Sequence, residues 1–203
     1  MKFLLLSLTF AMAMSGLAAS AESPAREVAA SPGKYTEKSI YRLSSKWTTD
    51  AGREIRLDSL LGKPVVLALF FTNCDHSCPI MVRDMKSLQS PLTAKASDKV
   101  QFVLVSIDPE RDTPEVLKSF RTKFRLPAER WMLVTGAADS VKQLAEKLGF
   151  NYAPGSKTQA AHSLLVTILD GKGEIAHQQA GLGVDRRGAI ETLEKLVKPK
   201  SGR

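Results

Sequence analysis

Two continuous apolar runs mark this chain, and each has the length of a buried β-strand. The first covers residues 64–71 and the second covers residues 100–106. A strand that is covered on both faces, as in a parallel sheet flanked by helices, shows such an unbroken run instead of alternation. Between them, residues 79–92 place apolar side chains at helical spacing. The pattern therefore predicts a β-α-β unit.

The rest of the pattern continues the alternation of strands and helices. It predicts an N-terminal hairpin (40–48 with 54–57), a helix capped by Thr113, a strand (131–135), a helix (139–148) ended by Gly149, a second hairpin (163–169 with 174–178) and a final amphipathic helix (187–197). Strands alternating with helices favour parallel pairing, and the hairpins add antiparallel strands. We therefore expect an α/β protein with a mixed central sheet flanked by helices. A cysteine motif after the first core strand makes the order thioredoxin-like.

The first residues have the features of an export signal. Lys2 is followed by apolar residues 3–13 and by the small-residue site Ala19-Ser20-Ala21. This pattern predicts a cleavable signal peptide over 1–21 and a periplasmic protein, although an uncleaved membrane anchor has a similar pattern. Residues 22–38 predict a flexible leader, and residues 39–199 predict one domain.

The formal net charge of +8 agrees with two kinds of partner. A basic exported protein can contact acidic protein surfaces or, weakly, an anionic membrane, although the charge also simply favours solubility. The sequence lacks a basic stripe interleaved with aromatic residues, so we expect no nucleic-acid partner.

The two cysteines of the chain, Cys74 and Cys78, lie between the first core strand and the helix that follows. In an oxidising compartment such a pair can be a structural disulfide, a dithiol/disulfide switch or a soft-metal site. Pro79 is suited to the first turn of a helix, which puts Cys78 at the helix N-terminus. Free N–H groups and the helix dipole favour a thiolate there, and a purely structural disulfide needs neither.

Two thiolates alone leave a metal ion under-coordinated, so a third donor is expected among the three histidines. His76 points away if both neighbouring cysteines bind one ion, and His177 is expected on the surface. His162 immediately precedes a predicted strand, a position that lies beside the cysteine motif in thioredoxin-like folds. Two thiolates and one imidazole suit copper, as Cu(I) or Cu(II), whereas zinc normally takes a fourth ligand.

Four segments taken together resemble the Sco/SenC family, and the likeness extends from about Ser39 to Val197. The segments are FTNCDHSCP (71–79), VSIDPERDTPEVL (105–117), WMLVTG (131–136) and AHSLLVTILDGKGEI (161–175). The resemblance implies a thioredoxin-like fold and a copper-binding protein that helps to assemble the dinuclear copper centre of cytochrome c oxidase. Some members act as thiol reductants.

The family's site residues can be matched to this sequence one by one. Its copper-binding cysteines match Cys74 and Cys78, its copper-binding histidine matches His162, and the aspartate of its DPERDT loop matches Asp108. Asp108 also fits an ordinary turn after a strand. The chain departs from the family at residues 75–77 and at Ala161, where the family has other residue types.

We therefore expect a periplasmic copper metallochaperone with a redox-active cysteine pair. The first alternative is an enzyme, a thiol-disulfide oxidoreductase that reduces the cysteines of a partner protein. A peroxidase of the peroxiredoxin class is disfavoured, because Asp75 occupies the position where that class has threonine or serine.

Overall fold

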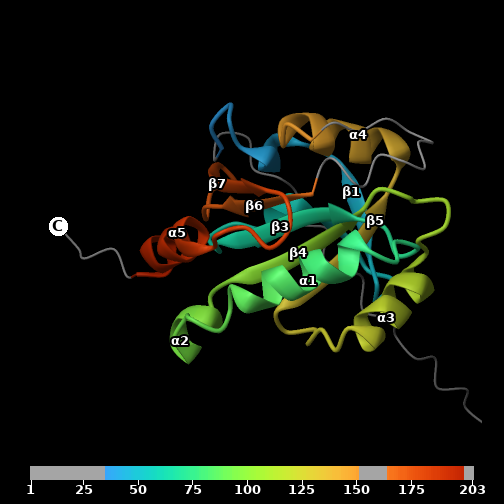
Figure 1. The fold of residues 1–203 in the computed structure, drawn as a ribbon. Helices are drawn as coiled ribbons and strands as arrows, with labels where there is room; N and C mark the ends of the chain where they lie inside the picture. The colour runs from blue at the N-terminus through green and yellow to red at the C-terminus, as the bar shows by residue number, and fades with distance from the viewer. Residues whose placement is uncertain (1–34, 151–163, 199–203) are drawn as a thin grey trace, which may run out of the picture.

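The computed structural model describes residues 35–150 and 164–198, and its centre is a seven-stranded sheet (Figure 1). The strands are β1 (Lys46–Thr49), β2 (Glu54–Arg56), β3 (Val65–Phe70), β4 (Gln101–Ser106), β5 (Trp131–Gly136), β6 (Leu165–Leu169) and β7 (Ile175–Ala180). The α-helices are α1 (Ser77–Ser87), α2 (Ala94–Ser97), α3 (Pro114–Lys123), α4 (Ala138–Lys147) and α5 (Arg187–Val197), and the 3-10 helices are η1 (Ile40–Arg42) and η2 (Leu57–Leu60).

Two sequence predictions fall outside these ranges. The predicted signal peptide and most of the leader belong to residues 1–34, and His162 belongs to residues 151–163. Within 35–150 and 164–198, no helix has both the length and the apolar character needed to cross a bilayer.

The sheet runs in the order β2-β1-β5-β4-β3-β6-β7. Its central strands β3, β4 and β5 are parallel, and the strands on either side are antiparallel. All residues of β3 and β4 are buried, which explains their unbroken apolar runs. The predicted mixed sheet of a thioredoxin-like fold is confirmed.

Each face of β3 packs against a different layer of helices (Figure 1). Val66, Ala68 and Phe70 belong to the cluster that includes residues of α1, α3 and α5. The alternate residues of β3 belong to the cluster that includes α4, η1 and η2. Because successive side chains of a strand point to opposite faces, one short segment anchors both layers.

Both predicted hairpins are present, but the first is shorter than expected. Residues 40–42 form η1 instead of extending β1. The Ser39 hydroxyl donates to the carbonyl of Lys172 and accepts a hydrogen bond from the N–H of Tyr41. These bonds turn the chain and bury Ile40 and Tyr41 beneath the β6–β7 hairpin.

The helix ends follow the predicted signals closely, except in α1. Thr113 caps α3, and Gly149 follows α4 with a φ of +68°. Helix α1 begins at Ser77, two residues before the expected Pro79, and ends at Ser87. Proline is tolerated throughout a first helical turn because the N–H groups there have no partner within the helix. Cys78 therefore lies inside the helix and not before it.

The C-terminus of α3 places a large side chain in a left-handed conformation. Arg125 has a φ of +49°, and hydrogen bonds from Arg125 N–H to Thr122 O and from Leu126 N–H to Arg121 O close the helix. Glycine is the usual residue at this position, because any Cβ is crowded there.

We predict that Arg125→Gly raises the free energy of unfolding by about 0.5–1 kcal/mol, because glycine relieves the crowding at this position. Urea denaturation measures the change. Lys118→Gly, in the middle of the same helix, is the matched control and should lower the free energy of unfolding by about 1 kcal/mol. A loss of stability in Arg125→Gly would contradict the assignment of this conformation.

Candidate metal centre

Cys74 and Cys78 lie where the chain passes from the end of β3 into α1. Cys74 is in the connecting loop, and Cys78 is the second residue of α1. Both side chains join the apolar cluster on the α1 face of the sheet, with 9% of Cys74 and 2% of Cys78 exposed. The carboxyl end of a parallel strand is a common place for a functional site in open α/β sheets.

The two cysteines lie close together and are not joined by a disulfide bond. The Cys78 backbone N–H donates to Cys74 Sγ at 3.2 Å, and the Ser77 hydroxyl lies 3.1 Å from the same sulfur. The first turn of α1 thus wraps around the Cys74 sulfur and supplies most of its polar contacts.

This arrangement shifts the pKa values of the two thiols in opposite directions. Burial raises the pKa of Cys74, but hydrogen bonds from the side chains and backbone of Cys78 and Ser77 outweigh it and bring the pKa below its usual range. Burial raises the pKa of Cys78 strongly, and the Cys74 sulfur and the Asp112 carboxylate raise it further. Cys74 is therefore the more acidic thiol of the pair, and Cys78 the less acidic one.

From the sequence we expected the helix N-terminus to stabilise the thiolate form of Cys78. The structure reverses this assignment for a geometric reason. The helix directs its free N–H groups back along the incoming loop, toward Cys74, while the Cys78 side chain turns into the core.

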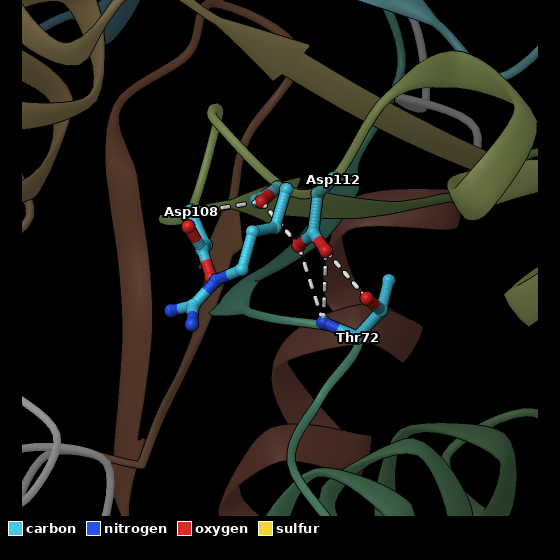
Figure 2. Close-up of polar contacts among 5 residues, drawn as sticks. Thr72, Asp108 and Asp112 are labelled. Atoms are coloured by element: carbon cyan, nitrogen blue, oxygen red, sulfur yellow. Dashed lines mark hydrogen bonds and ion pairs between the residues drawn. The ribbon is translucent and has the colours of Figure 1, made fainter.

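A buried carboxylate lies beside this loop, and it belongs to Asp112 (Figure 2). Only 1% of Asp112 is exposed. Its oxygens accept hydrogen bonds from the Thr72 N–H at 3.1 Å, from the Thr72 hydroxyl, and from the Ser106 hydroxyl at 2.5 Å. The sequence analysis did not single out Asp112 as a site residue. The sequence did contain one sign of this site, a hydroxyl residue at the end of each of two buried strands. Thr72 follows the first strand, and Ser106 ends the second.

Asp108, the aspartate singled out by the resemblance, lies in the same loop but makes different contacts (Figure 2). Its carboxylate forms an ion pair with Arg111 at 2.5 Å, and its N–H donates to the Ser106 hydroxyl at 3.0 Å. Arg111 is largely exposed. Within the described residues, the Asp108 side chain makes no hydrogen bond to either cysteine.

The structure separates the three histidines. His76 is the N-cap residue of α1 and is exposed, with no capping bond from its side chain. His177 lies on β7, an edge strand of the sheet, where its ring is close to Gly188 of α5. His162 is outside the described residues. Within the described ranges, no group of three or more histidine, cysteine, aspartate or glutamate residues is arranged to hold a metal ion.

The donors that are described fit a soft metal. Two cysteines this close can bind one thiophilic ion as thiolates, and the thiol protons must leave when it binds. The buried Cys78 thiol and the neighbouring Asp112 charge oppose the loss of the second proton. A third donor is needed to complete the site.

Comparisons with known proteins give a consistent set of relatives. A family model described as SCO1/SenC matches residues 34–198. The SCO1 protein homolog of Bacillus subtilis is 37% identical over 89 residues, which cover 44% of this chain and 46% of that protein. The chain thus spans about half the length of the curated relatives it matches.

Two solved structures are similar over most of this chain. One is BsSco, a member of the Sco family of cytochrome c oxidase assembly proteins in which a disulfide switch was identified; it is 26% identical, with a TM-score of 0.65, covering 76% of this chain and 92% of that one. The other is yeast Sco1 with copper bound, which is 25% identical, with a TM-score of 0.61, covering 78% of this chain and 88% of that one.

We predict that iodoacetamide modifies Cys74 much faster than Cys78 in the reduced protein at neutral pH. Cys74 is more exposed and carries the lowered pKa, whereas Cys78 is buried and carries the raised one. Peptide mapping by mass spectrometry measures both rates. The rate at Cys74 should rise with pH along a titration curve whose midpoint lies below the ordinary thiol pKa of about 8.5.

Ser77→Ala tests the cause of this difference, because it removes one hydrogen bond to Cys74 and leaves the backbone donor. Its alkylation curve should shift to higher pH. Equal rates at the two cysteines, or faster reaction at Cys78, would contradict the assigned asymmetry.

Proposed function

Because this chain belongs to the SCO1/SenC family, we propose that it is a copper metallochaperone that binds copper through Cys74, Cys78 and His162. The observation that carries the proposal is the pair of free cysteines at the carboxyl end of β3, held together by the hydrogen bond from Cys78 N–H to Cys74 Sγ. Thiolate sulfur favours Cu(I), and an imidazole nitrogen also accommodates Cu(II).

The proposed role of His162 rests on the sequence. It precedes β6, which pairs with β3 in antiparallel register from Leu169 opposite Val65 to Val166 opposite Ala68. The beginning of β6 therefore lies toward the same end of the sheet as the end of β3, where the cysteines follow. A ligand contributed from just before β6 would approach the cysteine pair from the neighbouring strand.

We further propose that the protein delivers copper to the copper-centre subunit of cytochrome c oxidase or to another copper-accepting protein. BsSco belongs to a family of cytochrome c oxidase assembly proteins, and yeast Sco1 has been solved with copper bound. A net charge of +8 favours contact with an acidic partner surface and, weakly, with an anionic membrane. The export pattern of residues 1–21 supports a periplasmic site of action, with residues 39–199 as the working domain.

A second function, thiol-disulfide exchange with a partner protein, is favoured by one specific observation. The pKa values of the two cysteines are shifted apart, so that Cys74 can attack a partner disulfide and Cys78 can then resolve the mixed disulfide. The exchange leaves Cys74 and Cys78 joined and the partner's cysteines reduced. Both functions use the same pair, since a disulfide can no longer offer two thiolates to copper.

We predict that His162→Ala weakens copper binding by the reduced protein at least tenfold and changes its absorption spectrum, because one of three donors is lost. Titration against a competing chelator measures the affinity. His177→Ala is the matched control and should bind like the wild type. Unchanged affinity and spectrum in His162→Ala would show that the assigned ligand set is wrong.

We also predict that oxidising Cys74 and Cys78 to a disulfide abolishes high-affinity copper binding, and that reduction restores it. The same titration, carried out before and after oxidation, measures the effect.

If the metal-free protein reduces partner disulfides at full rate and His162→Ala does so equally well, exchange is the main function. Copper binding by the oxidised protein would argue against thiolate ligands.

A further inference from the structure

Asp112 differs from the other buried aspartates of the described residues in its partners. Each of the other three forms an ion pair with an arginine: Asp50 with Arg121, Asp58 with Arg56, and Asp84 with Arg186. No lysine, arginine or histidine within the described ranges forms an ion pair with Asp112, although it is the least exposed of the four. Within the described residues, the donors to its carboxylate are neutral groups of Thr72 and Ser106.

A buried carboxylate without a cation is a poor way to stabilise a fold. Its removal from water is costly, and neutral hydrogen bonds offset that cost without clearly exceeding it. Apolar groups of similar shape often serve stability as well or better. The placement of Asp112 therefore points to a role in positioning its donors.

The donors of Asp112 come from the ends of two neighbouring parallel strands. The β3–β4 ladder ends with Phe70 opposite Ser106, followed by a hydrogen bond from Ile107 N–H to Phe70 O at 2.8 Å. Two residues after Phe70, the Thr72 N–H donates to the Asp112 carboxylate at 3.1 Å. Figure 2 shows the carboxylate facing Thr72 across the gap between the strand ends.

Thr72 lies only two residues before Cys74, whose sulfur accepts the Cys78 N–H at 3.2 Å. The cysteine loop is thus held at one end by Asp112 and at the other by the first turn of α1. We propose that Asp112 is a positioning residue that, through Thr72, fixes the separation of the Cys74 and Cys78 sulfurs and so sets their dithiol/disulfide equilibrium. This inference deepens the proposed function, but its test needs no copper.

The decisive experiment compares two substitutions of Thr72 in the full chain. Thr72→Val keeps the shape and removes the hydroxyl that donates to Asp112, whereas Thr72→Ser keeps the hydroxyl. Looser positioning lowers the effective concentration of one thiol at the other. We expect Thr72→Val to lower the equilibrium constant for disulfide formation about tenfold, or about 30 mV for this two-electron couple. Thr72→Ser should remain within about twofold of the wild type.

The equilibrium constant is measured in glutathione redox buffers by trapping free thiols, alongside thermal unfolding of each variant. Asp112→Asn, which keeps the shape and removes the charge, should shift the constant in the same direction as Thr72→Val. Asp50→Asn is the matched control, because it breaks a buried aspartate–arginine pair elsewhere. It should lower the unfolding temperature and leave the constant unchanged.

Several results would overturn the proposal. One is an unchanged equilibrium constant for disulfide formation in Thr72→Val. Another is a shift in Thr72→Ser or Asp50→Asn as large as that in Thr72→Val, which would indicate general loosening of the fold. If Asp112→Asn does not fold, the Thr72 pair decides alone. Failure of the wild type to bind copper would reject the proposed function and leave this equilibrium to be judged on its own.

Discussion

At the carboxyl end of β3 the chain leaves a fully buried strand and enters α1 after a short loop, and the hydrogen bond from Cys78 N–H to Cys74 Sγ closes that loop. This bond brings the two sulfurs together, orients the free end of the helix toward one of them and leaves the other in the core. Against the effect of burial, this bond helps to lower the pKa of Cys74, whereas burial raises the pKa of Cys78. Because β3 anchors helices on both faces of the sheet, the position of the loop is fixed by the packing of the whole domain.

Local signals in the sequence were sufficient for most of the fold. The runs at 64–71 and 100–106 predicted β3 and β4, because only a strand covered on both faces is apolar throughout. Thr113 and Gly149 marked the ends of two helices through their own backbone chemistry. Residues 40–42 were misassigned as strand, because their 3-10 turn depends on Lys172 and Gly173, more than 100 residues away.

The candidate site was predictable only in part, for the same reason. Two closely spaced cysteines near the start of a helix are visible in the sequence, and so is a histidine before a strand. The role of Asp112 was not visible, since it exists only where the ends of β3 and β4 meet. The direction in which Cys78 points was also hidden, because it depends on whether the helix begins at Ser77 or at Pro79.

The contact between η1 and the β6–β7 hairpin has a consequence for the orientation of the molecule. Ser39 and Ile40 are bonded to Lys172 and Gly173, beside the end of β6 that pairs with the start of β3. The cysteines follow the other end of β3, about 20 Å away for a strand of this length. Tyr35, whose ring packs against Tyr41, therefore lies at the pole opposite the cysteines. A tether at that pole would leave the end of the sheet that carries the cysteine loop turned away from the attachment point.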